Sequence, residues 1–150
     1  MNHSLAIFFA SVVIAGSVNS ATAAEWHEAS DKGLLVYTLG NGATGQLTMV
    51  CDPENIWAAE DQKQSPQYYV FVSRHNQRLD SDTLSIKASD FDASMASPGG
   101  AFVASSDKKT WNKLIATISE PGKISIGAGK DKFALDVTKP MKTRCQLETE

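Results

Sequence analysis

The chain has 150 residues, 21% of them charged, and a formal net charge of −3 at pH 7. A mildly acidic chain without a basic cluster is a poor match for nucleic acid or an anionic membrane surface, so neither is expected as a main partner. The length allows one domain with a core of its own and is too short for two.

The N-terminal segment has the pattern of a secretory signal. It contains no Asp, Glu, Lys or Arg, and its apolar core, which begins at Leu5, is shorter than the roughly 20 apolar residues that a membrane span needs. Small residues follow and end in the letters ATAA, an A-x-A-like cleavage pattern. We predict a signal peptide over residues 1–24, cleaved after Ala23 or Ala24, and one exported domain over residues 25–150. An uncleaved membrane anchor is the alternative.

The chain has two cysteines, Cys51 and Cys145. An even number in an exported chain makes pairing the default, and a bridge across so long a loop stabilises a domain by roughly 4–5 kcal/mol in the chain-entropy model. Two free thiols or a redox pair are the alternative, which no C-x-x-C spacing supports. No N-x-S/T sequon follows the signal segment, which fits a bacterial periplasm. We predict a periplasmic or secreted protein.

Strand-forming residues dominate the first half of the expected domain. Residues 34–39 and 47–51 flank a glycine-containing turn, which predicts a β-hairpin. Residues 52–55 contain proline and turn formers and are expected to end the second strand, before a polar surface loop over residues 60–67. The apolar run over residues 68–72 predicts a central strand.

Turns and short strands alternate in the middle of the chain. Residues 74–78 predict a turn, and Leu84 and Ile86 alternate with polar residues as in a strand with one solvated face. Residues 89–100 are small and polar, so we expect the longest loop there, in a position suited to a functional surface. Residues 102–104 predict a further short strand.

One helix is expected before the last hairpin. Its apolar residues recur at helical spacing and share one face: Trp111, Leu114, Ile115 and Ile118. We expect Thr110 to cap this helix and Pro121-Gly122 to end it.

The end of the chain predicts a closing hairpin and a second helix. The strands are expected near residues 124–126 and 133–137, and a short helix over residues 138–145 would present Cys145 to the sheet. With about seven strands and one or two short helices, the predicted fold is mainly β, an antiparallel β-sandwich or a partly open barrel.

The sequence offers no recognisable catalytic motif. His27 and His75 lack the spacing of a zinc site, no serine lies in a G-x-S-x-G elbow, and the glycines of residues 127–130 indicate a turn rather than a phosphate loop. We predict a non-enzymatic protein without metal or cofactor. A carboxylate site for calcium or acid–base chemistry stays open as an alternative, built from Asp80, Asp82, Asp90 and Asp92.

Turn, loop and aromatic residues form the predicted binding surface. Trp57 lies between a turn and a charged loop, where an exposed aromatic ring anchors interfaces. Tyr68 and Tyr69 open an apolar strand, which favours the core over an aromatic platform for a glycan. The candidate surface residues are Trp57, His75, Asp90, Phe91, Asp92, Ser97, Pro98 and Gly99.

The order of these segments resembles that of small periplasmic β-domains of the invasion-associated locus B family and of accessory lipoprotein-like proteins of type VI secretion. The residues that carry the likeness are LTMVC at 47–51, WNKLI at 111–115, Ile124, Ile126, FAL at 133–135 and Cys145. The resemblance implies pairing of an early strand cysteine with a C-terminal one, and a role as an envelope accessory or in host interaction. It carries over no catalytic residues.

The functional prediction is therefore a protein that binds another envelope or secreted protein through a loop or a sheet edge. Inhibition of, or immunity against, a cell-wall hydrolase and an accessory role in secretion or adhesion both stay open. A protruding loop over residues 89–100 would favour an inhibitor, because such a segment can plug a hydrolase cleft. The alternative is a carbohydrate- or peptidoglycan-binding module that uses Trp57 and neighbouring aromatic residues.

Overall fold

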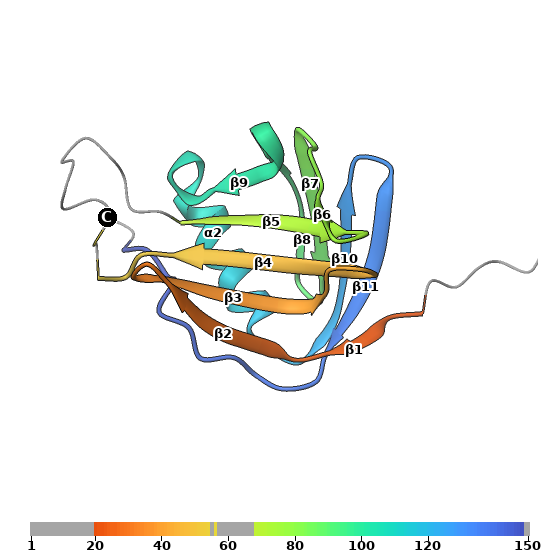
Figure 1. Cartoon of the computed structure of the whole chain (residues 1–150), viewed down its shortest axis with the longest axis horizontal. Coiled ribbons are helices and arrows are strands. Elements are labelled where there is room, and N and C mark those ends of the chain that lie inside the picture. The colour runs from red at the N-terminus through yellow and green to blue at the C-terminus, as the bar shows by residue number, and fades with distance from the viewer. Residues whose placement is uncertain (1–19, 55, 57–67, 149–150) are drawn as a thin grey trace, which may run out of the picture.

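The computed structural model describes residues 20–54, 56 and 68–148, which form two β-sheets packed face to face (Figure 1). Sheet A has the order β1-β11-β10-β7-β8, with bounds Thr22–Ala24, Asp131–Val137, Gly122–Ala128, Thr83–Ala88 and Phe91–Ala96. Sheet B has the order β2-β3-β4-β5-β6, with bounds Trp26–Asp31, Leu34–Asn41, Gly45–Cys51, Tyr69–Arg74 and Gln77–Arg78. Strand β9 (Ala101–Val103) also pairs with β5.

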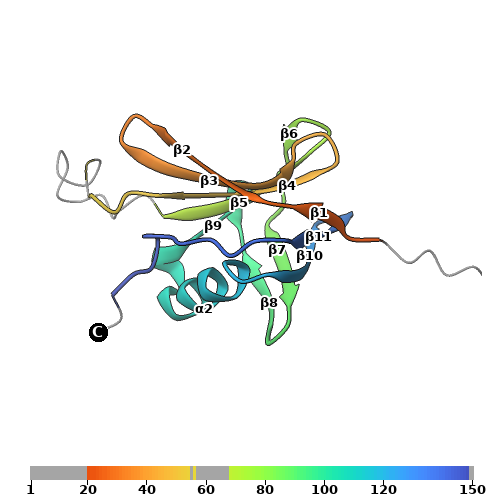
Figure 2. The same ribbon diagram turned by 90° about the horizontal axis from the view of Figure 1, so that it is seen from below.

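The mainly β sandwich expected from the sequence is confirmed. Within the described residues every strand pairing is antiparallel except that of β1 with β11. Apolar and polar residues alternate as a half-buried strand requires: in β7, Leu84, Ile86 and Ala88 are buried, and the residues between them are exposed. Figure 2 shows the two layers edge-on, with β2 to β5 in one layer and sheet A and α2 in the other.

Helix α2 (Lys108–Ile118) buries the face that the sequence predicts. Trp111, Leu114, Ile115 and Ile118 have no exposed surface. The predicted cap was wrong, because Asp107 lies at the N-cap and its carboxylate accepts a hydrogen bond from the Thr110 backbone amide at 2.9 Å. An aspartate there satisfies a free amide and places its charge at the positive end of the helix dipole.

The predicted C-terminal helix is absent. Residues 138–148 run without regular structure along α2, and their polar groups bond across the chain. The Met141 amide donates to the Ser119 carbonyl at 2.8 Å, and the Trp111 indole donates to the Cys145 carbonyl at 2.7 Å. The Asn112 side chain both donates to and accepts from the Leu147 backbone. These tertiary bonds replace the i to i−4 bonds of a helix.

The disulfide between Cys51 and Cys145 is confirmed. It joins β4 to the C-terminal segment across 94 residues of sequence, with a Cα–Cα distance of 5.5 Å, and both cysteines are buried. It therefore ties sheet B to the segment that packs on α2. A disulfide between the only two cysteines is typical of proteins outside the reducing cytoplasm.

The predicted loop over residues 89–100 was wrong. Residues 91–96 form β8, which pairs with β7 along its whole length, and only a short turn precedes it. Phe91, Ala93 and Met95 point inward at every second position, which is the pattern of a half-buried strand. The small polar residues around them hid this pattern in the sequence. A 3-10 turn, Pro98–Gly100, then leads into β9.

Strands β1 and β2 fall where no strand was expected. These two consecutive strands are edge strands of different sheets. Strand β1 pairs in parallel with β11 of sheet A, and β2 pairs with β3 of sheet B. Ala24 is buried in the core and its carbonyl accepts a hydrogen bond from the Thr138 amide. Cleavage after Ala24 would remove the whole of β1 from sheet A, whereas cleavage after Ala23 would leave its last residue, Ala24.

Candidate functional site

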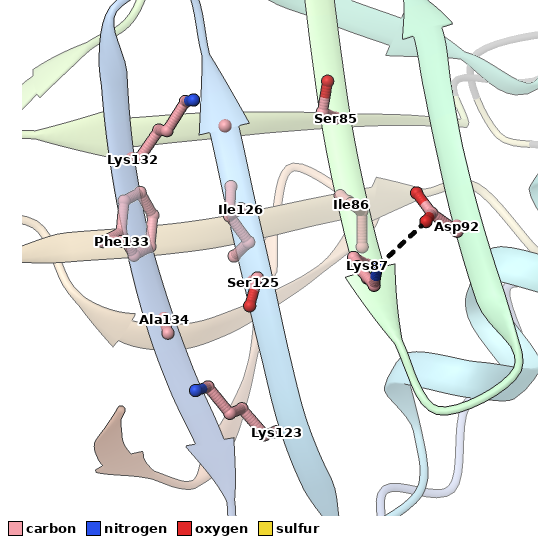
Figure 3. A pocket seen from close by; sticks show the side chains of 11 residues that line it. Ser85, Ile86, Lys87, Asp92, Lys123, Ser125, Ile126, Lys132, Phe133 and Ala134 are labelled. Carbon is pink, nitrogen blue, oxygen red and sulfur yellow. Dashed lines mark ion pairs between the residues drawn. The ribbon is translucent and has the colours of Figure 1, made fainter. Parts of the chain in front are cut away.

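The outer face of sheet A holds a hollow of about 640 Å³, which we call the sheet A hollow (Figure 3). Its floor is made of small residues from three neighbouring strands, Ser85, Ser125, Gly127 and Ala134. The strand register explains the shape: Ser85 lies beside Gly127, and Ser125 beside Ala134, so four short side chains meet on one side of the sheet. Longer side chains stand around them.

Three lysines stand around this floor. Lys87 comes from β7, Lys123 from β10 and Lys132 from β11, and all three are exposed. Lys87 pairs with Asp92 across β7 and β8 at 3.3 Å, a contact in which both side chains are 73% exposed and which contributes little to stability. Within the described part of the chain, Lys123 and Lys132 make no ion pair. Figure 3 shows them on either side of Ser125 along the β10–β11 hairpin.

The outer face of sheet B differs in chemistry. One transverse row across five strands is wholly apolar, and the register aligns its members as Ala29, Val36, Val50, Tyr69 and Val103. Val50 is only 4% exposed although it points away from the core, because its neighbours on both sides are larger or branched. Val103 is 40% exposed.

An aromatic stack lies on this sheet B face. The rings of Tyr69 and Phe71 are 6.2 Å apart and 25° from parallel, and the guanidinium carbon of Arg78 lies 4.7 Å from the Phe71 ring centre. Tyr69 is half-buried on the outer side of β5, so its prediction as a core residue was wrong. Tyr68, its neighbour, is in the core at 7% exposure and packs edge-on against Trp111, as expected.

The predicted surface residues do not come together as one site. Asp90 and Asp92 lie near the turn between β7 and β8, whereas Ser97, Pro98 and Gly99 follow the far end of β8. The six residues of β8 span about 20 Å, so these two groups are at opposite ends of the strand. Trp57 lies outside the described residues.

Two of the predicted residues have side chains that cannot reach a partner. Phe91 is 3% exposed and belongs to the core, because it is the first inward position of β8. Ser97 is 1% exposed, and its hydroxyl donates to the Ser81 carbonyl at 2.6 Å, which fixes the turn after β8. The prediction that Phe91 and Ser97 belong to an exposed binding surface was therefore wrong.

His75 and Gly99 lie on the sheet B side of the molecule. His75 occupies the β5–β6 turn in a left-handed conformation, and its amide donates to the Ala43 carbonyl of the β3–β4 turn at 3.0 Å. The Gly99 carbonyl accepts a hydrogen bond from Arg78 at 3.0 Å. Gly99 thus positions the arginine of the aromatic stack through its backbone.

The groups considered for catalysis are spread over the fold. His27 is on β2 and His75 is in the β5–β6 turn. Asp80 and Asp82 precede β7, whereas Asp90 follows it, so β7 separates the two pairs of aspartates. Among the described residues, no three His, Cys, Asp or Glu side chains lie close enough to hold a metal ion. None of the described helices has the length and apolarity needed to cross a membrane.

Two buried tyrosines have shifted acidities. Burial raises the pKa of Tyr68 above its ordinary value, and the neighbouring charge of Asp52 raises it further. Burial also raises the pKa of Tyr37, with a hydrogen bond to Glu28 as the next cause. Both rings lie in the core between the sheets.

No protein-family model matches this chain, and neither curated proteins nor solved structures give a significant match. The resemblance to the invasion-associated locus B family therefore stays a prediction. Sequence reasoning missed both outer faces, although the lysines of β10 and β11 and the Tyr69–Phe71 alternation follow from period-two spacing once the strands are assigned.

Proposed function

We propose that this is an exported, non-enzymatic protein of the periplasm or the extracellular space that binds another protein through the outer face of sheet A. The observation that carries the proposal is the sheet A hollow, a small-residue floor with three exposed lysines around it. Two of these lysines have no ion pair within the described residues. The partner is therefore one that presents acidic side chains to this face.

The electrostatics favour recognition over structural stabilisation. An exposed lysine contributes little to folding, but several lysines around one hollow attract an acidic partner and speed its association. The floor residues leave room for a partner side chain between the lysines, because none of them extends beyond a hydroxymethyl group. The inner side of sheet A packs into the core between the two sheets, which supports this face from behind.

The structure bears on the choice between inhibitor and accessory factor. A cleft-plugging inhibitor needs a protruding segment, and β8 occupies most of residues 89–100, where the sequence predicts one. We therefore favour an accessory role in the envelope, in which a sheet face holds a partner, over insertion of a loop into an enzyme cleft.

The test is an affinity pull-down from envelope extract with the exported protein, comparing wild type with Lys123→Glu/Lys132→Glu. The matched control is Lys108→Glu/Lys142→Glu, which makes the same charge change at exposed lysines outside the hollow. We expect the hollow variant to lose its stoichiometric partner and the control to keep it. Equal recovery by both variants, or recovery of bait alone by wild type, would contradict the proposal.

One observation favours the second candidate, a glycan-binding module. Trp57, on which the sequence-based prediction of this module depends, lies outside the described residues. The Tyr69–Phe71 stack places two half-buried aromatic rings on the outer face of sheet B, and the apolar C–H face of a sugar can pack against such rings.

A further inference from the structure

We propose that Tyr69, Phe71 and Arg78 form a binding site for a carboxylated sugar ring, such as a uronic acid residue of an acidic glycan. This inference rests on the second candidate function, glycan binding, and is independent of the sheet A hollow. It adds a site, a ligand charge and a role for Arg78 to that candidate.

The first support is the geometry of the stack. Tyr69 and Phe71 are two residues apart on β5, so their side chains leave the same face of sheet B. Their rings are 25° from parallel at 6.2 Å, and Arg78 continues the row with its guanidinium carbon 4.7 Å from the Phe71 ring centre. Two aromatic rings and a planar cation therefore follow one another along β5.

The second support is how the structure makes room for this row. Ala101 of β9 lies opposite Phe71, and a methyl group there leaves space for the guanidinium to lie over the ring. Arg78 of β6 lies opposite Ser73 of β5, so the arginine side chain is on the outer face of sheet B. The Gly99 carbonyl then fixes the guanidinium with a 3.0 Å hydrogen bond. Gly99 has a positive φ of 64°, a conformation that glycine adopts without strain.

The third support is the unused charge. Arg78 carries five N–H donors, and one hydrogen bond is made by its guanidinium. No carboxylate pairs with it within the described part of the chain, whereas Arg74 and Arg144 each have an acidic partner. An exposed guanidinium that is already oriented is suited to a carboxylate, which it can bind through two parallel hydrogen bonds.

Polar groups flank the row on its other side. Gln46 lies opposite Ser73 and is half-buried, whereas Thr48, opposite Phe71, is buried and accepts the hydrogen bond that the Gln46 amide donates at 2.9 Å. The Gln46 amide is therefore the polar group beside the aromatic rings that can meet a sugar hydroxyl. The oriented cation selects an acidic sugar over a neutral one, because it adds a charge-assisted contact that a neutral sugar lacks.

The experiment measures binding of trigalacturonate to the exported protein by calorimetry, with the neutral galactotriose and with acetate as comparison ligands. We expect trigalacturonate to bind at least tenfold more tightly than either. Arg78→Gln should weaken its binding about tenfold, because the charge-assisted hydrogen bonds are lost. Arg78→Lys should give an intermediate value, and Tyr69→Ala should weaken the binding without changing the ratio of acidic to neutral ligand.

The controls separate this inference from the two proposals above. Arg144→Gln, at an arginine paired with Glu54, and Lys123→Glu/Lys132→Glu should both bind trigalacturonate like wild type. Thermal unfolding of each variant verifies that it is folded. Unchanged binding in Arg78→Gln, equal binding of the neutral sugar or of acetate, or no binding of trigalacturonate would each overturn the inference. Loss of trigalacturonate binding in the lysine variant alone would place the acidic ligand in the sheet A hollow instead.

Discussion

The outer faces of the two sheets are built by the same alternation and yet have opposite chemistry. The face of sheet A carries serine, glycine and lysine, as expected of a solvated surface. The face of sheet B carries an apolar row with Val50 buried at its centre and an aromatic stack beside it. A β-sandwich needs apolar residues only on its inner faces. The requirements of folding therefore explain the polar outer face of sheet A, but they do not explain the apolar outer face of sheet B. The aromatic stack on the second face is the part of it that the proposed glycan site would use.

The largest effect is expected from removing the disulfide that joins the two layers. Cys51→Ala/Cys145→Ala should lower the free energy of unfolding by about 4 kcal/mol, because the unfolded chain regains the entropy of a long closed loop. Urea denaturation measures this loss. If both faces still bind their ligands under conditions where the variant is folded, the faces act independently of the C-terminal segment. Unchanged stability would contradict the expectation.

The contrast between the faces themselves is tested by one substitution on each. Val50→Lys places a charge at a buried outward position of sheet B and should cost about 2–3 kcal/mol. Ser125→Lys adds the same side chain to the floor of the sheet A hollow and should change stability by less than about 0.5 kcal/mol. Chemical denaturation of the two variants side by side gives the comparison. Equal costs would show that the faces are not different environments.

The contribution of the edge strand β1 to stability is tested by comparing proteins with two different N-terminal residues. A protein that starts at Glu25 lacks β1, and with it the burial of Ala24 and the pairing with β11. Relative to a protein that starts at Ala21, it should lose about 1–2 kcal/mol of stability. The mass of the exported protein shows which start is used. A mass that corresponds to Glu25, together with equal stability of the two forms, would mean that β1 is dispensable.

The smallest effect concerns Tyr68, which points into the core from the position just before β5, the strand that carries the aromatic stack on its outer face. The pKa of Tyr68 is raised by burial, so the folded protein holds this proton more tightly than the unfolded chain. Its contribution to stability is complete below the ordinary pKa of 10.0 and is lost as the pH rises through the native value. Tyr68→Phe should reduce the loss of stability above pH 10.0. Thermal unfolding of wild type and variant as a function of pH measures this difference, and identical pH profiles would contradict the expectation.

Strong local patterns made most of the fold predictable. The hairpin of β3 and β4, the strand β5, the closing hairpin and the buried face of α2 all follow from periodicity and turn residues. The same rule failed at β8, where alanine and serine hide the alternation of Phe91, Ala93 and Met95. It also failed at residues 138–148, where helix signals lost to hydrogen bonds with α2.

The predicted surface was less successful than the predicted fold. Turn residues and polar stretches indicate exposure but not proximity, and β8 separates Asp90 and Asp92 from Ser97, Pro98 and Gly99 by the length of a strand. Phe91 is buried at the first inward position of β8, and Ser97 is buried in the turn after this strand. Gly99 has a role that its residue type does not show, since its carbonyl orients Arg78 from a distant part of the sequence.

The sequence by itself determined the fold class, the cysteine pair and the buried face of the helix, because alternation, cysteine count and helical spacing act locally or have a single solution. The tertiary structure alone decided which outward residues meet. Lys87, Lys123 and Lys132 surround one hollow, and Arg78 lies over Phe71, because strand register and order set these neighbours. Register depends on the packing of whole sheets, and no single segment encodes it.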